Sequence, residues 1–239
     1  QTEYTYNASN RLLRERGARN VDYAWDDNGN LIAKTNESGT ETYHWNARDR
    51  LMQIVRADGQ SIQNSYLPMS NLRRSTRNST GPEKKYVWDM LTENSVQVVS
   101  PEEFNANDYI NGLQTDELYG MTHAGRPFAY LTDALGTVRG VYAGDGSLMN
   151  SYTYRVFGEI RQELETVPNE RKFASRAVVD NGYLYFNRAR YLDTSVGRFV
   201  SADYFEHNEM AGQPFAENDL MRFLERYNYA KNNPMSYLD

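Results

Sequence analysis

Short stretches of alternating apolar and polar residues follow one another along the first 160 residues of the chain. VDYAW, NLIAKT, TETYHW and RLMQIV are four consecutive examples between residues 21 and 55. Such alternation is the period of a β-strand with one buried face. Turn signals separate the stretches, among them DDNG at 26–29, NESG at 36–39 and RADG at 56–59. A turn about every ten residues predicts two strands per repeat and therefore an antiparallel meander.

An aromatic–x–aromatic pair recurs at a nearly constant interval within this pattern. YTYNASNRL at 4–12, YAWDDNGNL at 23–31 and YHWNARDRL at 43–51 are successive copies, each ending in leucine. The second aromatic residue of each copy is, in order, Tyr6, Trp25, Trp45, Tyr66, Trp88 and Tyr154. The first three intervals between these residues are 19, 20 and 21 positions. A weaker copy at 130–140 has Thr132 at the corresponding position. One hairpin cannot bury its own apolar face, but stacked hairpins bury it together. We therefore expect the aromatic pairs to line the inner face of one continuous sheet.

Composition and charge narrow the function classes. The chain has 239 residues with 19 tyrosines, a net charge of -6, a pI near 5.2 and no cysteine. The acidic balance disfavours a general role in nucleic-acid binding, and the missing cysteines exclude disulfides and thiolate metal sites. Stacking on sugars or bases is the alternative use for the aromatic residues, but they follow the period of the fold. Three scattered histidines predict no metal site, no motif predicts a cofactor, and no apolar run reaches the length of a membrane span.

The strand pattern weakens near residue 160. The segment 161–182 is polar, and 203–219 reads as a connector poor in strand signals. One helical pattern follows, with Asn218 or Asp219 as its N-cap and apolar positions at Leu220, Phe223, Leu224 and Tyr227. We predict a β-rich unit at 1–160 and a second, C-terminal unit at 161–239, whose last forty residues form a compact turn-and-helix element. Because the chain does not begin with methionine and shows no signal pattern, we expect it to be a fragment or a processed piece.

Four segments in the second half carry a family resemblance. They are GLQTDELYG at 112–120, YLTDALGTVRGVYAGDGSLMNSYTYRVFGEI at 130–160, NGYLYFNRARYLDTSVGRFVSAD at 181–203 and RYNYAKNNPMSYLD at 226–239. With the repeats before them, they resemble YD-repeat proteins of the rearrangement-hotspot (Rhs) family. The C-terminal part is similar to the Rhs-associated core of bacterial polymorphic toxins and of the C component of insecticidal toxin complexes. Animal teneurins carry related repeats.

The resemblance implies a mainly β fold, in which YD-repeat hairpins form part of a hollow, spiralling β-sheet shell with a short helical or irregular core element at its C-terminal end. Such a shell encloses a toxic C-terminal domain and helps to deliver it. The core of the family is a self-cleaving aspartic protease that cuts just beyond a PxxxxDPxGL motif. PMSYLD at 234–239 matches the first half of that motif, and neither its second half nor a toxin is visible.

The resemblance also points to candidate catalytic residues. Aspartic proteolysis needs two carboxylates that share one proton. Asp239 belongs to the cut-site motif, and Asp203 matches a family aspartate whose usual proline neighbour is a tyrosine here. Asp193 is a third candidate, although it also suits the first position of a turn. Arg198 would orient such a carboxylate or balance its charge, or would serve as a strand-edge residue. Asp219 is a weaker candidate, since it also suits a helix cap.

The leading hypothesis is a shell component of a bacterial Rhs polymorphic toxin that acts in interbacterial competition or within a toxin complex. Its expected partners are the enclosed toxin, upstream shell segments or a companion shell protein, and a secretion-system spike, chaperone or immunity protein. We expect a secreted or delivered effector that is cytoplasmic in the producing bacterium before export. Single-cut self-proteolysis is the only enzymatic activity that the resemblance implies. The alternative is an adhesive YD-repeat surface that binds glycans or proteins and has no proteolytic activity.

Overall fold

The computed structural model describes residues 2–102, 105–180, 182–203 and 225–237. Sixteen strands form one antiparallel sheet, in which every strand pairs with its neighbours in sequence. Their bounds are β1 Glu3–Tyr6, β2 Leu12–Arg16, β3 Val21–Trp25, β4 Leu31–Asn36, β5 Gly39–Trp45, β6 Leu51–Val55, β7 Ser61–Tyr66, β8 Arg73–Asn78, β9 Glu83–Trp88, β10 Ser95–Ser100, β11 Asn105–Asn111, β12 Leu118–His123, β13 Arg126–Thr132, β14 Val138–Ala143, β15 Leu148–Tyr154 and β16 Ile160–Glu165. The predicted meander of YD-repeat hairpins is confirmed.

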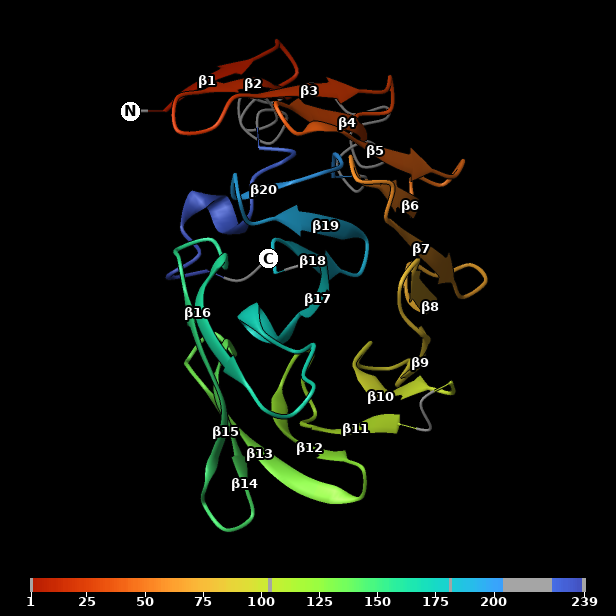
Figure 1. Ribbon diagram of the computed structural model, residues 1–239, viewed down its shortest axis with the longest axis vertical. Helices are drawn as coiled ribbons and strands as arrows, with labels where there is room; N and C mark the ends of the chain where they lie inside the picture. The colour runs from red at the N-terminus through yellow and green to blue at the C-terminus, as the bar shows by residue number, and fades with distance from the viewer. Residues whose placement is uncertain (1, 103–104, 181, 204–224, 238–239) are drawn as a thin grey trace, which may run out of the picture.

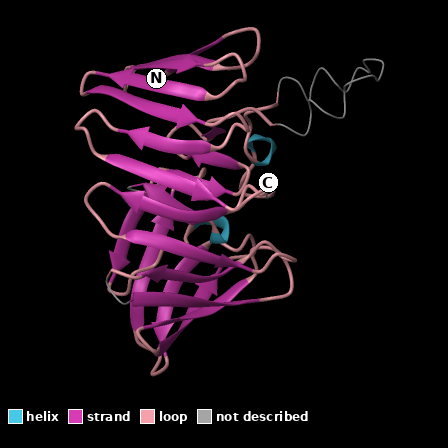
Figure 2. Cartoon of the chain, turned by 90° about the vertical axis from the view of Figure 1, so that its right-hand side faces the viewer, coloured by secondary structure: helices cyan, strands magenta, loops and turns pink. Residues whose placement is uncertain are grey.

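A second, four-stranded antiparallel sheet follows in the chain. It consists of β17 Ala177–Asp180, β18 Leu184–Asn187, β19 Arg190–Asp193 and β20 Arg198–Phe199. The large sheet curls around it, so that β1–β4 lie at the top of Figure 1, β5–β10 descend on one side, β11–β14 cross the bottom and β15–β16 rise on the other side. Figure 2 shows the same strands as a stack seen from the side. The curl stays open, because β1 and β16 are the two ends of the strand order.

The described residues contain two short 3₁₀ turns, η1 Phe173–Ser175 and η2 Ala230–Asn232. The helical pattern predicted from Leu220 to Tyr227 lies mostly outside the described residues, and its last three residues form a turn. The large sheet runs to Glu165, five residues beyond the predicted boundary at 160. The division of the chain into two domains stays a prediction.

The second aromatic residue of each repeat has a specific structural role. The register shifts just before Trp25, Trp45, Tyr66 and Tyr154, so each ring is directed by a β-bulge. The polar atom of the ring then donates to a backbone carbonyl in the preceding hairpin, from Trp25 to Leu12 at 2.7 Å, from Trp45 to Leu31 at 2.7 Å, from Tyr66 to Leu51 at 2.8 Å, from Trp88 to Arg73 at 2.6 Å and from Tyr154 to Val138 at 2.9 Å. This hydrogen bond explains why the position holds tryptophan or tyrosine rather than phenylalanine.

The polar residue that follows the second aromatic closes the turn. A side-chain oxygen of Asp26 accepts the N–H four residues later at 2.8 Å, and Asn46 and Asp133 make the same contact at 3.1 and 3.0 Å. In these turns the third residue after the capping residue has a left-handed backbone, with φ of 90° at Gly29 and 54° at Asp49. Glycine, asparagine and aspartate tolerate this conformation best, which accounts for the NG and RD dipeptides of the repeats.

Three hydrophobic clusters fill the concave side of the large sheet. The first joins the buried Tyr23 and Tyr43 to β18, and a second gathers Tyr86 and Tyr152 with their neighbours. A third lies around η1, β18 and the 229–230 segment. The aromatic pairs therefore face inward as predicted. In β1, Tyr4 and Tyr6 are 43% and 42% exposed, although the Tyr6 ring lies 5.0 Å from the Arg198 guanidinium of β20. Both residues lie in the edge strand β1, which pairs within the sheet with β2 alone.

Candidate functional site

The small sheet is anchored to the large one by a buried ion pair at one end. Lys34 of β4 contacts Asp193 at the end of β19, and the Asp193 side chain is 1% exposed. The Lys34 ammonium lies 5.5 and 5.3 Å from the ring centroids of Tyr43 and Tyr183. The Tyr183 hydroxyl donates to Glu41 at 2.7 Å. The Lys34 cation, placed between two rings and paired with a carboxylate, thus links β4 of the large sheet to β19 of the small sheet.

Asp193 also stabilises the turn that follows β19, as its place in the sequence suggested. Its Oδ1 accepts the backbone N–H of Ser195 at 2.9 Å and the hydroxyl of the same residue at 2.6 Å. Arg198 is the cross-strand partner of Asp193 in the β19–β20 register. Its guanidinium, however, donates to the Asn228 Oδ1 at 3.1 Å and to the Asn10 carbonyl at 2.8 Å. Burial lowers the pKa of Arg198 below its ordinary value.

Asp203 lies just beyond β20 and is partly buried. Its Oδ2 is 3.1 Å from Nη1 of Arg190, and its backbone N–H donates to the Arg226 carbonyl at 3.1 Å. Asp239 lies outside the described residues. The structure therefore places Asp193 and Asp203 each beside a cation, and sets Arg198 opposite Asp193 while the Arg198 guanidinium bonds Asn228 and Asn10. The catalytic roles of these four residues stay predictions.

Sequence reasoning missed a second anchor, at Asp116 in the GLQTDELYG segment. Its carboxylate oxygens pair with Nη2 of Arg176 at 2.9 Å and with Nη2 of Arg188 at 3.0 Å. Asp116 has a φ of 63°, and its backbone N–H donates to Asn94 at 2.7 Å. Burial lowers the pKa of Arg176 to about 10, although the Asp116 carboxylate opposes the shift. The GLQTDELYG segment was recognisable in the sequence, but Arg176 and Arg188, which pair with its aspartate, lie far along the chain.

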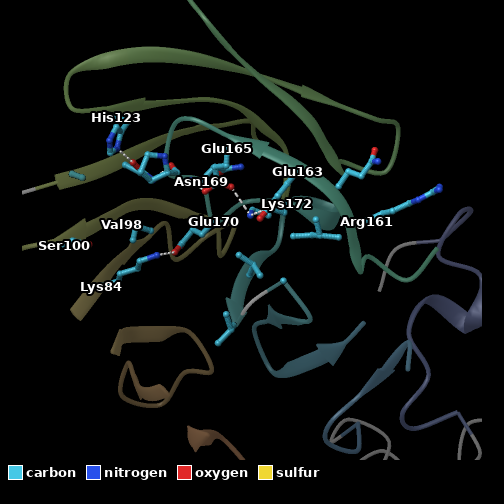
Figure 3. A pocket seen from close by; sticks show the side chains of 18 residues that line it. Lys84, Val98, Ser100, His123, Arg161, Glu163, Glu165, Asn169, Glu170 and Lys172 are labelled. Atoms are coloured by element: carbon cyan, nitrogen blue, oxygen red, sulfur yellow. Dashed lines mark hydrogen bonds and ion pairs between the residues drawn. The ribbon is translucent and has the colours of Figure 1, made fainter. Parts of the chain in front are cut away.

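A polar cavity of about 670 Å³ lies between the two sheets (Figure 3). It is bounded by the wall of β9–β12, by β16, by the 168–172 segment and by β17. Its lining residues are Lys84, Val98, Ser100, Ala106, Asn107, His123, Ile160, Arg161, Gln162, Glu163, Glu165, Pro168, Asn169, Glu170, Lys172, Val178, Val179 and Gly182. We call this cavity the chamber.

Two charge clusters mark the chamber wall in Figure 3. The Lys172 ammonium is 3.0 Å from the Glu163 carboxylate and 2.9 Å from that of Glu165. Glu170 is 6% exposed, and its Oε2 lies 3.4 Å from Nζ of Lys84, whereas its Oε1 is buried without a hydrogen-bond partner. The part of the chain that the structure describes holds no group of three or more His, Cys, Asp or Glu side chains suited to a metal ion. The chamber is therefore a polar cavity whose wall carries two clusters of paired charges and one buried, unpaired carboxylate oxygen.

Part of the chain matches a known family model, and nearly all of it aligns with a curated relative. Residues 25–61 match the RHS Repeat family model. The tRNA3(Ser)-specific nuclease WapA of Bacillus spizizenii is 23% identical over 98% of this chain, which corresponds to 10% of the length of that nuclease. This chain therefore spans only a small part of the relative that it matches.

Two solved structures have the same fold as the whole chain. A TcdB2–TccC3 crystal structure aligns with a TM-score of 0.51 and 13% identity over 100% of this chain and 16% of that chain. A Photorhabdus luminescens Tc holotoxin pore with a mutated TccC3 aligns with a TM-score of 0.57 and 12% identity over 100% of this chain and 15% of that chain. The architecture is thus that of a curled β-meander found in toxin complexes. Residues 25–61 thus match the RHS repeat that the YD pattern of the sequence indicated.

Within the described residues, no helix combines the length and the apolar character that a membrane crossing needs.

Proposed function

We propose that this chain is a section of an Rhs shell that encloses a toxic passenger domain, and that its core takes part in the intramolecular cut that releases the passenger. The passenger would be joined at the C-terminal end, and upstream shell segments or a companion shell protein would complete the enclosure. The whole assembly would be a secreted or delivered effector, handled by a secretion spike, chaperone or immunity protein.

One observation carries the enclosing role. The large sheet curls over sixteen strands, with its aromatic rungs inside and its core on the concave face. Each hairpin widens the sheet by two strand spacings of about 4.8 Å, so further repeats of the same kind can lengthen the wall. The similarity to segments of toxin-complex structures supports the same role, although this chain covers only 16% and 15% of those chains.

The position of Asp203 supports a part in release. Its side chain lies 3.1 Å from Arg190, and an arginine beside a carboxylate can orient it as a general base toward water. An aspartic mechanism needs a second, protonated carboxyl group, and Asp239 in the cut-site motif is our candidate. We assign Asp193 a structural role, since Lys34 and Ser195 already engage its carboxylate.

The release function is tested on a chain that continues beyond Asp239 through the second half of the PxxxxDPxGL motif into a fluorescent reporter. We expect the unaltered protein to cut itself once, and Asp203→Asn and Asp239→Asn to remain intact. Asp145→Asn is the matched control, because Asp145 lies in an exposed turn and only caps Ser147. An unaltered protein that never cuts would remove the proteolytic role and leave the enclosing one.

The enclosing function has its own readout. With the upstream shell or companion protein present, the reporter should resist proteinase K for much longer than the same reporter alone. A reporter that is digested at the rate of the free protein would contradict enclosure, whatever the result of the cleavage test.

A further inference from the structure

The chamber runs along an uncovered strand edge. Successive side chains of a strand point to opposite faces, yet Arg161, Gln162 and Glu163 all line the same cavity. A cavity reaches both faces of a strand only by passing around its edge. β15 covers one edge of β16, and β16 is the last strand of its sheet. The chamber therefore follows the free edge of β16 (Figure 3).

The register identifies the backbone groups on that edge. The Thr166 N–H donates to the Met149 carbonyl at 3.3 Å, which makes these residues a hydrogen-bonded pair. Hydrogen-bonded and non-hydrogen-bonded pairs alternate along an antiparallel ladder. Glu165 and Glu163, which face Asn150 and Tyr152 in register, therefore direct their N–H and C=O groups away from β15. No turn or loop hydrogen bond among the described residues uses these groups.

The charges of the chamber indicate what kind of ligand it takes. Three cations, Lys84, Arg161 and Lys172, balance the three carboxylates of Glu163, Glu165 and Glu170. Both β16 carboxylates are already held by Lys172. The chamber has no excess charge with which to select a cation or an anion. Besides the unpaired Oε1 of Glu170, the recognition groups that it offers are the backbone donors and acceptors of β16, beside the apolar side chains of Val178 and Val179 in β17.

We propose that the chamber binds an extended polypeptide segment, which adds to the free edge of β16 as a further strand of the sheet. Strand addition recognises the backbone of its partner, and side-chain pockets add specificity. A cleft without excess charge accepts segments of varied sequence, because it recognises their backbone. The occupant we infer is an extended stretch of the enclosed passenger, so the identity of the occupant rests on the proposed function. The volume of the chamber, about 670 Å³, lies within the range of binding pockets.

The test uses the 239-residue chain and a fluorescein-labelled peptide of alternating valine and threonine with a lysine at each end. A second peptide carries N-methyl groups on alternate residues and cannot pair as a strand. Glu163→Pro removes the N–H that faces the chamber and keeps the ladder bonds of the flanking residues. Glu163→Ala removes the same carboxylate but keeps the N–H. Fluorescence anisotropy should show binding about fivefold weaker for Glu163→Pro than for Glu163→Ala, which is the effect of one lost hydrogen bond.

A measurement on the unaltered protein guards against misfolding of the proline variant. The peptide should slow hydrogen exchange of the Glu163 and Glu165 amides and leave those of Gln162 and Leu164 unchanged. Equal binding of the N-methylated peptide, slowed exchange elsewhere in the chain, or no binding of either peptide would overturn the proposal. Proteinase protection of the reporter separates the two ideas, because protection without peptide binding removes strand addition alone and leaves enclosure standing.

Discussion

The hydrogen bond from the second aromatic ring to the preceding hairpin predicts a definite cost when its donor is removed. Tyr154→Phe keeps the ring, which packs 6.0 Å from Phe173, and removes only the hydroxyl that donates to the Val138 carbonyl at 2.9 Å. Val138 is fully buried, so no bulk water replaces the lost donor. A buried hydrogen bond contributes about 1 kcal/mol, and an unpaired partner raises the loss to about 1–3 kcal/mol. For a chain of this size, a loss near 2 kcal/mol lowers the melting temperature by about 4–8 °C.

The assay is thermal and urea unfolding followed by far-ultraviolet circular dichroism. Tyr119→Phe is the matched control, because the Tyr119 side chain is exposed and its hydroxyl donates a solvent-exposed hydrogen bond to the Glu117 carboxylate. We expect the control to melt with the unaltered protein and Tyr154→Phe to melt earlier with an unchanged urea dependence. Equal melting temperatures for Tyr154→Phe and the unaltered protein would refute the idea that this bond fixes one hairpin to the next.

Three further results are expected. In the strand register Arg73 lies opposite Tyr66, as Leu31 and Leu51 lie opposite Trp25 and Trp45. Arg73 is fully buried between two aromatic rings at 4.5 and 4.3 Å, and its side-chain nitrogens have no hydrogen-bond partner among the described residues. Arg73→Leu should therefore stabilise the protein by about 1–3 kcal/mol, and a loss of stability would contradict this. Gly158→Ala should lower the melting temperature more than Gly59→Ala, because both positions have positive φ but only at Gly158 would a Cβ meet the Phe173 ring, at 2.5 Å. Burial raises the pKa of Tyr130 and of most core tyrosines above the usual 10.0, so the folded protein retains protons that the unfolded chain releases and stability should fall as the pH rises above 10. Absorbance at 295 nm should then show the ionisation of the buried tyrosines only together with unfolding, whereas ionisation of all 19 tyrosines near pH 10 in the folded protein would contradict this.

The local architecture could be predicted because each hairpin repeats the same alternation of buried and exposed residues and the same turn. The alternation of VDYAW and NLIAKT specifies strands with one buried face, and the spacing of Trp25 and Trp45 specifies hairpins of equal length. The capping Asp26 and the left-handed Gly29 are readable from DDNG. These features depend on neighbours within one repeat, and the sequence displays them directly.

The junction between shell and core could not be predicted in the same way. Lys34 and Asp193 are 159 positions apart, and no local pattern marks either residue as half of a buried pair. Leu72 keeps the leucine of the repeat six residues after Tyr66, so the sequence does not show that Arg73 pairs with Tyr66 and lies between aromatic rings of two sheets. The candidate pairing of Asp203 with Asp239 came from the family resemblance alone. Its geometry depends on residues outside the described part of the chain.

The central claim is that the core lies in the concavity of the curled sheet and contacts its hairpin turns, and a disulfide tests it most directly. Asn30, at the β3–β4 turn, forms an antiparallel bridge with Ser201, which follows β20. The flanking hydrogen bonds make this a non-hydrogen-bonded pair, with Cα atoms about 4.5 Å apart and within disulfide range. The natural chain has no cysteine, so Asn30→Cys with Ser201→Cys creates the only thiols. Our account predicts nearly complete disulfide formation in the folded protein under mild oxidation, and none for Asn30→Cys with Ser147→Cys. Thiols of the first pair that stay free in the folded protein would contradict the placement of the core.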